Sequence, residues 1–264
     1  MSEKSIIFFD IDGTIVTEDG SLTIPESTAG AIDRARKNGH YTFINSGRTL
    51  FNISRKVRAL GFDGLICGCG TYIEMNSEIL LYNALSQEFC RNTAEFLRKT
   101  GVTPVYEHKD GYFFDDFCPK NEGLKEFFEV FIDDNIPVDR RVEDSDFIFD
   151  KFVIWENPES DMELFRSEIG KSFEIIDRGG GIYENVPLGF SKATAIEVIL
   201  EKLGIPLENA YAIGDSANDL PMLRAVPNSI AMGGAKTVYP YVSYITTPIM
   251  EDGIYNALEH FGLI

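Results

Sequence analysis

The feature that most constrains this chain is a short apolar run that ends in two aspartates. The run Ser5–Phe9 is followed at once by Asp10, Ile11 and Asp12. A continuously apolar strand is typical of a parallel sheet buried on both faces, and ligands of such sheets bind at the carboxyl ends of the strands. Two carboxylates at that place cost free energy unless a cation or a proton neutralises them. The pair therefore predicts a functional site.

Short apolar runs and helical stretches alternate before residue 83 and again after residue 185. This alternation predicts an α/β domain whose parallel sheet is covered by helices on both faces. Its expected strands and helices are Ser5–Phe9, Pro25–Asn38, Tyr41–Asn45, Leu50–Leu60, Phe190–Leu203, Ala210–Ile213, Asp219–Ala225, Ser229–Ala231 and Gly253–His260.

The chain between these two blocks has a different pattern. Adjacent strands joined by turn residues such as Lys109-Asp110-Gly111 indicate an antiparallel α+β module. We therefore predict two domains, a discontinuous core of residues 1–82 and 186–264 and an inserted domain of residues 83–185. The expected helices of the insertion are Gln87–Lys99, Glu122–Asp133 and Ser160–Lys171, and its strands lie near Val102–His108, Tyr112–Asp115, Phe152–Trp155, Phe173–Ile176 and Ile182–Val186.

The acidic composition narrows the classes of partner. The 264 residues include 24 basic and 42 acidic side chains, a formal net charge of −18, which repels nucleic acids and anionic membranes. The apolar run before Asp10 is too short for a signal peptide or a membrane span, and four cysteines do not form a dense disulfide framework. We expect a cytoplasmic protein, a monomer or small homo-oligomer, with no nucleic-acid or membrane partner.

The first pair of acids suits phosphoryl transfer. One carboxylate can attack phosphorus to form an aspartyl-phosphate, and a second can protonate the leaving oxygen and later deprotonate the attacking water. Asp10 suits the first role and Asp12 the second. A calcium-binding EF-hand loop is the alternative, but it requires Gly at position six and Glu at position twelve, where this chain has Ile15 and Ser21.

A second acidic motif follows a later apolar run, where Asp215 ends a predicted strand and Asp219 opens the next helix. Mg²⁺ typically takes one or two protein carboxylates and keeps several waters. Asp10, the backbone carbonyl of Asp12 and Asp215 make such a set. Taken alone, this segment is equally consistent with polar side chains that cap a helix.

Two weaker signals concern phosphate binding. Ser46, Gly47 and Arg48 follow a predicted strand, and a hydroxyl with backbone N–H groups at a helix start can hold phosphate oxygens. Lys192 lies just before another helix and offers a positive charge for a transferring phosphoryl group. A lone lysine is, however, commonly a solvated surface side chain.

These motifs, in this order and with an insertion between the second and the third, resemble the haloacid-dehalogenase (HAD) superfamily of phosphatases, in particular its Cof-type branch with a large α/β (type IIB) cap. The resemblance covers nearly the whole chain. Its motifs correspond to Asp10–Thr14, to Ser46 in Ser46-Gly47-Arg48, to Lys192, and to Gly214-Asp215 with Asn218-Asp219. It implies a Rossmann-like parallel-sheet core that carries the reaction and an inserted α+β cap that selects the substrate.

The resemblance also implies a role for each motif residue. It makes Asp10 the nucleophile and Asp12 the acid/base, with Ser46 and Lys192 completing the catalytic set. The implied metal ligands are Asp10, Asp12, Asp215 and Asp219. The implied phosphate or substrate contacts are Thr14, Ser46, Gly47, Arg48, Lys192 and Asn218.

The implied activity is that of a Mg²⁺-dependent phosphatase for a small phosphorylated metabolite, with sugar phosphates and related monoesters as the favoured class. Two alternatives remain: a phosphomutase of the same superfamily and a non-catalytic protein that binds a phosphometabolite. Candidate substrate contacts in the inserted domain are Glu107, His108, Tyr112 and Arg178, with solvated loop positions as the alternative.

Overall fold

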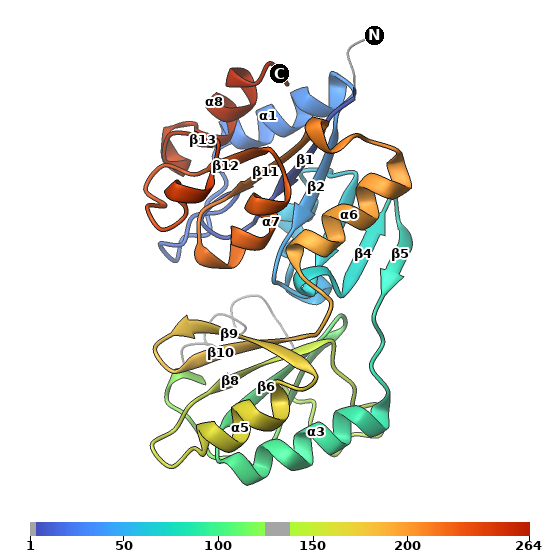
Figure 1. The fold of residues 1–264 in the computed structure, drawn as a ribbon, viewed down its shortest axis with the longest axis vertical. Coiled ribbons are helices and arrows are strands. Elements are labelled where there is room, and N and C mark those ends of the chain that lie inside the picture. The colour runs from blue at the N-terminus through green and yellow to red at the C-terminus, as the bar shows by residue number, and fades with distance from the viewer. Residues whose placement is uncertain (1–3, 125–137) are drawn as a thin grey trace. The chain divides into compact units, whose positions relative to one another are not determined.

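The computed structural model describes residues 4–124 and 138–264, and the chain divides into two compact units (Figure 1). Unit 1 comprises Met1–Arg48, Ile53–Tyr82 and Phe190–Ile264. Unit 2 comprises Thr49–Asn52 and Asn83–Gly189. Most of the helix expected at Glu122–Asp133 lies outside the described residues.

Unit 1 is built around a sheet with the strand order β13-β12-β11-β1-β2-β3-β4-β5. The strands from β13 to β3 in this order pair in parallel, whereas β4 and β5 pair antiparallel at one edge. Every residue of β1 is buried, as its continuous apolar sequence requires. The strands are β1 Ile6–Phe9, β2 Tyr41–Asn45, β3 Gly64–Cys67, β4 Tyr72–Met75, β5 Glu78–Tyr82, β11 Ala210–Gly214, β12 Asn228–Ala231 and β13 Tyr244–Ile245.

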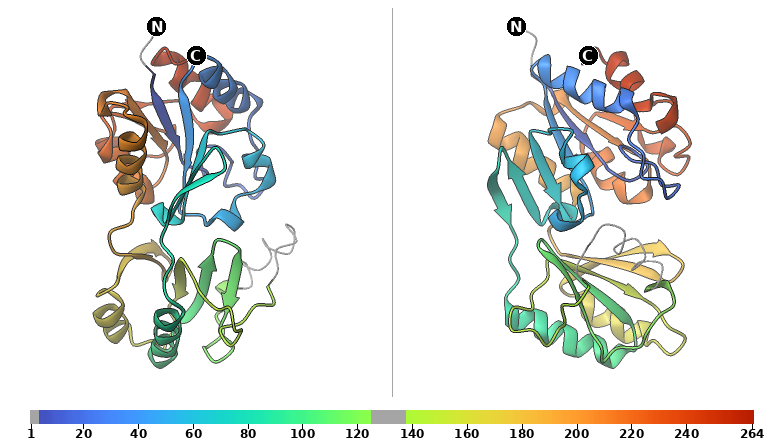
Figure 2. Two further views of the ribbon diagram at one scale, coloured as in Figure 1. Left: turned by 90° about the vertical axis from the view of Figure 1, so that its right-hand side faces the viewer. Right: turned by 180° about the vertical axis from the view of Figure 1, so that it is seen from behind.

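Helices cover both faces of this sheet (Figure 2). Helix α1 contacts α8 on one face, and α6 contacts α7 on the other. Under α6, Ile196 and Ile199 belong to the same buried cluster as Phe8 and Phe43 of the sheet. The α/β class expected from the sequence is therefore confirmed. The helices are α1 Glu26–Lys37, α2 Arg55–Arg58, α6 Lys192–Leu203, α7 Leu220–Ala225 and α8 Gly253–His260.

One helix of unit 1 differs from the prediction. In place of a helix at Leu50–Leu60, the chain forms a 3₁₀ turn at Leu50–Asn52 and the short helix α2. Ser54 separates them, because its side chain accepts a hydrogen bond from the backbone N–H of Val57 and begins α2 as its N-cap. A serine hydroxyl that competes for backbone donors thus overrides the helical pattern.

The sequence prediction also lacks the antiparallel strands β4 and β5. Their connection contains Asn76 and Ser77, both with positive φ, 49° and 66°. Turns of this kind match the twist of a tight hairpin. Asn-Ser signals such a turn more weakly than Asn-Gly does, which is why the sequence pattern does not reveal it.

Unit 2 contains a five-stranded antiparallel sheet in the order β7-β6-β8-β10-β9. Helices α3 and α5 cover one face, where Tyr106, Phe149 and Phe152 form part of a packed aromatic cluster. The antiparallel α+β module expected here is present. Its elements are α3 Gln87–Thr100, β6 Thr103–His108, β7 Gly111–Phe114, β8 Lys151–Trp155, α5 Met162–Ile169, β9 Phe173–Gly179 and β10 Ile182–Pro187.

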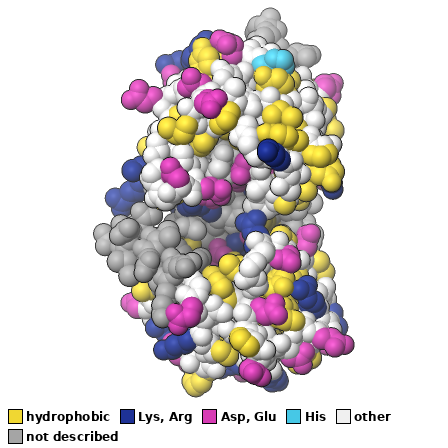
Figure 3. All heavy atoms as spheres, turned by 90° about the vertical axis from the view of Figure 1, so that its left-hand side faces the viewer, with side chains coloured by type: hydrophobic (Ala, Val, Ile, Leu, Met, Phe, Trp, Pro, Cys, Tyr) yellow, Lys and Arg dark blue, Asp and Glu magenta, His cyan; other side chains and the backbone are white. Residues whose placement is uncertain are grey.

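The surface carries charge of both signs. On the face drawn in Figure 3, acidic and basic side chains are interspersed rather than gathered by sign. No helix among the described residues has both the length and the apolar character that a membrane crossing requires. Cys67, Cys69, Cys90 and Cys118 are all buried, and none of them forms a disulfide.

Candidate active site

Three neighbouring strands of unit 1 end at the candidate site. Strands β11, β1 and β2 lie side by side and run in parallel. Asp215 follows β11, Asp10 follows β1 and Ser46 follows β2. The carboxyl ends of parallel strands meet at one edge of a sheet. The fold therefore brings together residues that lie up to 205 positions apart in the chain.

Lys192, the first residue of α6, links two of the acids. Its Nζ donates to Asp10 Oδ1 at 2.6 Å and to Asp219 Oδ1 at 2.5 Å. All three side chains are buried, with 5% exposure or less. Burial by itself lowers the pKa of Lys192, but the charges of Asp10 and Asp219 more than offset this, so that its pKa is raised and it stays protonated. The solvated alternative for Lys192 does not hold.

The carboxylates outnumber this single cation. Asp10, Asp215 and Asp219 each offer an oxygen within 4.8 Å of the others. Burial first, and then the charge of Asp219, raise the pKa of Asp10 to about 7. The same two causes raise the pKa of Asp215 to about 8. Lys192 pairs with two of these acids, and the only side-chain donor that the described residues give Asp215 is the Thr14 hydroxyl, at 3.5 Å.

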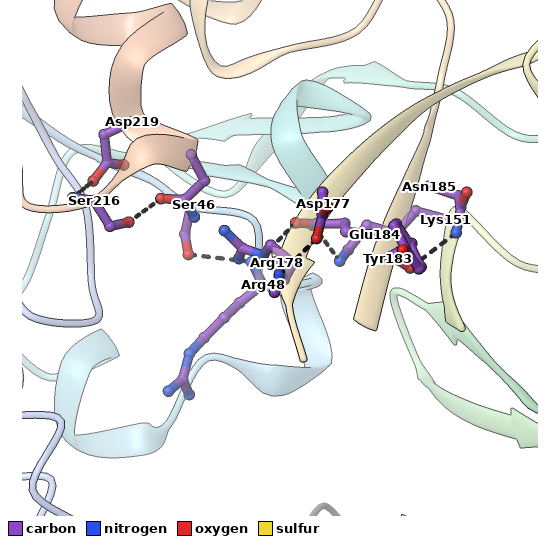
Figure 4. Close-up of polar contacts among 12 residues, drawn as sticks. Ser46, Arg48, Lys151, Asp177, Arg178, Tyr183, Glu184, Asn185, Ser216 and Asp219 are labelled. Atoms are coloured by element: carbon purple, nitrogen blue, oxygen red, sulfur yellow. Dashed lines mark hydrogen bonds and ion pairs between the residues drawn. The ribbon is translucent and has the colours of Figure 1, made fainter. Parts of the chain in front are cut away.

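This excess of negative charge fits a bound cation. Buried carboxylates that cannot all ionise beside one another are stabilised when a divalent metal neutralises them. The donors are all carboxylate oxygens, which are the ligands of hard cations such as Mg²⁺. Asp10 and Asp215 would hold the metal. Asp219 is already engaged by Lys192 and by the backbone N–H of Asp215 at 2.9 Å. It also accepts from the backbone N–H of Ser216 at 3.1 Å (Figure 4).

Asp12 lies outside this group of three acids and pairs with Arg48. Arg48 Nε donates to Asp12 Oδ2 at 2.8 Å, and Nη2 donates to Asp12 Oδ1 at 2.6 Å. A bidentate pair of this kind fixes both the position and the plane of the carboxylate. The Asp12 side chain is 35% exposed, so it is within reach of solvent. The predicted acid/base and the predicted nucleophile thus have distinct surroundings.

The remaining predicted contacts lie in the loops around these residues. Ser46 is buried, and its Oγ accepts from the N–H of Arg48 at 3.2 Å, across the turn that contains Gly47. Asn218 lies in a 3₁₀ turn before α7, and its Oδ1 accepts from the Ser216 hydroxyl. These residues all belong to unit 1.

The sequence motif does not reveal why Gly13 follows Asp12. Gly13 has φ +71°, and a Cβ at this position would lie 2.3 Å from Asp215 Oδ2. Glycine therefore satisfies both a left-handed backbone and the close approach of a carboxylate. Asn45 is a second residue with no role assigned from the sequence, although an amide at the end of an apolar strand signals a buried polar contact.

A family comparison decides the class of this site. The model of the haloacid dehalogenase-like hydrolases matches residues 7–258. This chain belongs to that family. Both the acidic strand end at Asp10 and the loop with Asp215 fall inside the matched region.

Several of the similar proteins are phosphatases by name. The putative phosphatase YkrA of Bacillus subtilis is 27% identical, and the match covers 99% of both chains. The 5-amino-6-(5-phospho-D-ribitylamino)uracil phosphatase YcsE of the same organism is 26% identical over 98% of this chain and 96% of that protein. A solved HAD subclass IIB sugar phosphatase is 31% identical with a TM-score of 0.82, covering 99% of this chain and 100% of that one. The chain is a HAD phosphatase, an enzyme that acts on phosphorylated substrates.

Replacing Gly13 tests whether the position of Asp215 matters. In Gly13→Ala, the new methyl group must displace Asp215. A misplacement of about 1 Å in an active site costs about 100-fold in turnover. The matched control is Gly20→Ala, because Gly20 has a similar φ of +84° but no described atom within 4 Å of the added Cβ. Both variants carry the backbone strain, so their melting temperatures should fall alike. Equal turnover of the two variants in a phosphate-release assay contradicts the assignment.

Proposed function

We propose that this enzyme hydrolyses a small phosphate monoester, of which sugar phosphates are the favoured class, through an aspartyl-phosphate on Asp10 with the help of Mg²⁺. The observation that carries the proposal is the contact of a buried carboxylate with a buried cation, Lys192, beside a further acid that lacks a cationic partner among the described residues. The similarity to a solved sugar phosphatase supports the substrate class. The net charge of −18 favours a small substrate over nucleic acids or membranes.

In the first half of the reaction, Asp10 attacks phosphorus as the bond from phosphorus to the leaving oxygen breaks. Asp12 gives a proton to that oxygen. Lys192 orients Asp10 and favours its ionised form against the opposing effect of burial, and its charge offsets the negative charge on the transferring group. Ser46, Gly47 and the loop around Asn218 supply hydrogen bonds to the phosphate oxygens.

In the second half, Asp12 takes a proton from water while the water oxygen attacks phosphorus, and inorganic phosphate leaves Asp10 as a free carboxylate. Arg48 supports this step, because its bidentate contact fixes the position and the plane of the Asp12 carboxylate. Proton donation in the first half requires this pair to loosen. Asp10, Asp215 and the Asp12 carbonyl would hold Mg²⁺, which would supply charge that offsets the acids and the phosphate.

Removal of divalent metal tests the cofactor. Turnover of a phosphate monoester should disappear in a chelator and return with Mg²⁺, because the acids otherwise repel the anionic substrate. Asp215→Asn should raise the Mg²⁺ concentration needed for half-maximal turnover. Undiminished phosphate release in excess chelator contradicts this part of the proposal.

Rapid-quench kinetics of Asp12→Ala separates the roles of the two aspartates. Loss of the acid should slow the first step strongly for a sugar phosphate, whose leaving alkoxide is poor, and weakly for a nitrophenyl phosphate. Loss of the base should make phosphoenzyme accumulate with the nitrophenyl ester, seen as a burst followed by slow release. Asp10→Asn is the control and should form no phosphoenzyme with either ester. Equal losses on both esters, without a burst, would restrict Asp12 to holding the metal.

The alternatives differ from a phosphatase in their products. A phosphomutase returns the phosphoryl group to a second hydroxyl of the sugar, whereas a binding protein releases nothing. Release of one inorganic phosphate for each ester consumed, with no phosphorylated isomer, therefore supports hydrolysis. The Asp10–Lys192 pair and the neighbouring acids favour an active enzyme over a silent binding protein.

Unit 2 carries a second buried ionic cluster, formed across three of its strands. Lys151 Nζ on β8 donates to Glu107 Oε1 on β6 at 3.1 Å. It also donates to Glu184 Oε1 on β10 at 2.7 Å (Figure 4). All three side chains are at most 6% exposed. Arg178 on β9 lies 3.2 Å from Glu184 Oε2.

The cluster lies on the face of the sheet away from α3 and α5. Successive side chains of a strand point to opposite faces. Tyr106, Phe152 and Tyr183 pack in the cluster with the two helices, so their neighbours Glu107, Lys151 and Glu184 point the other way.

Such a cluster is a poor way to stabilise a sheet. Buried ion pairs are often replaced by apolar side chains without loss of stability. We therefore assign to Lys151, Glu107 and Glu184 a role in selecting the substrate, with the cap function assigned to unit 2. A lysine that donates and carboxylates that accept can together match the hydroxyl groups of a sugar.

Exchange of Lys151 tests this role. Lys151→Met should lower kcat/KM for sugar phosphates by about 10-fold or more, the cost of a charged hydrogen bond, and change kcat/KM for nitrophenyl phosphate little. The matched control is Lys171→Met, which breaks an exposed pair with Glu168 at 2.7 Å in the same unit and should leave both substrates unaffected. An unchanged ratio of kcat/KM between the two substrate types contradicts a role for Lys151 in selecting the substrate.

A further inference from the structure

Asn45 is a buried polar residue at the end of β2. It is the last residue of β2, and its side chain is fully buried. Its neighbours along the strand, Phe43 and Ile44, are buried apolar residues. A buried amide costs free energy unless its hydrogen bonds are made, so the groups that it contacts indicate why it is there.

The contact of Asn45 leads to the lysine of the candidate active site. Asn45 Nδ2 donates to the backbone carbonyl of Lys192 at 2.9 Å, across 147 residues of chain. Asn45 Oδ1, by contrast, has no hydrogen-bond partner among the described residues. An unpaired buried acceptor costs about 1–3 kcal/mol. The bond to Lys192 is therefore the one hydrogen bond that the described residues give this side chain.

The segment that begins α6 is held from two further sides. Ser191 and Thr194 form a capping box at its N-terminus, with Thr194 N donating to Ser191 Oγ at 3.1 Å. Gly70, at φ +93°, approaches so closely that a Cβ there would lie 2.6 Å from the Ser191 carbonyl oxygen. Three independent restraints thus converge on one turn of backbone, the turn from which the Lys192 side chain extends.

We propose that Asn45 is a positioning residue for catalysis: its bond to the Lys192 carbonyl fixes the start of α6 against the end of β2 and so places Lys192 Nζ between Asp10 and Asp219. The Nζ contacts of 2.6 Å and 2.5 Å leave little tolerance for a shift of the backbone. The apolar interior beneath α6 resists tilting of the helix but does not fix its position along the strands, whereas a directional hydrogen bond does. This inference rests on the role proposed above for Lys192.

A double-mutant cycle in the full-length enzyme tests the proposal. Asn45→Val keeps a strand-forming side chain and removes the donor, and it should lower the single-turnover rate by about 10- to 100-fold. In a Lys192→Met background the same change should alter the rate by less than about twofold, because a residue that acts only through Lys192 has nothing left to position. Measurement with enzyme in excess over nitrophenyl phosphate keeps the slow double variant measurable.

Asn228→Val is the matched control. Asn228 begins β12 in the same sheet, and its Nδ2 also donates to backbone carbonyls, of Glu208 at 2.8 Å and Ala210 at 3.0 Å. It lies at the opposite end of its strand from the site, so its loss should lower the melting temperature without a change in rate. Asn45→Ala provides a smaller side chain in case Asn45→Val does not fold, with the same rates expected.

The outcomes distinguish the positioning role of Asn45 from the proposed role of Lys192. A full rate for Asn45→Val, or equal fold losses in the wild-type and Lys192→Met backgrounds, overturns the positioning role while the role of Lys192 stands. A rate loss in Asn228→Val as large as that in Asn45→Val overturns it as well. If Lys192→Met itself retains the full rate, the proposed role of Lys192 fails, and the inference fails with it.

Discussion

The bridge from Lys192 to Asp10 and Asp219 is the interaction on which the rest of unit 1 depends. It joins the end of β1, the start of α6 and the loop before α7, which are three separate segments of the chain. Each acid is buried, and breaking a buried pair by removing one partner leaves an uncompensated charge at a cost of about 3–5 kcal/mol. The lysine is thus required to balance the charge of the acidic strand end, in addition to its proposed role toward phosphate.

The strand order explains why the acids and the lysine can meet at all. Parallel pairing of β11, β1 and β2 aligns three strand ends, and the loops that follow them carry Asp215, Asp10 and Ser46. Gly13 then lets the loop after β1 approach Asp215 more closely than any other residue would. Burial first, and then the charge of Asp219, raise the pKa of both Asp10 and Asp215. A bound cation would offset this cost, so the sheet topology that gathers the acids also favours the metal site proposed above.

The strands that end at the candidate site could be predicted from the sequence, because the ends of buried strands in an α/β sheet follow from the hydrophobic pattern. The α/β class and the antiparallel insertion follow from that pattern, whereas features set by side-chain competition do not. Ser54 ends the predicted helix at Leu50–Leu60 by capping a new one. The bidentate contact of Arg48 with Asp12 and the bond of Asn45 to Lys192 depend on where side chains point across 36 and 147 residues. Pattern alone carries no information about such contacts.

The buried cluster around Lys192 and the buried cluster around Lys151 differ in their balance of charge. Each centres on one lysine between two carboxylates, Lys192 in unit 1 and Lys151 in unit 2. Unit 1 adds a further acid, Asp215, whereas unit 2 adds a cation, Arg178. The first cluster therefore has an excess of negative charge that fits a divalent cation. The second is close to neutral, and buried neutral arrays of donors and acceptors discriminate between polar groups rather than bind ions. A buried lysine between two carboxylates thus fits the phosphoryl transfer proposed for unit 1 and the selection among hydroxylated leaving groups proposed for unit 2.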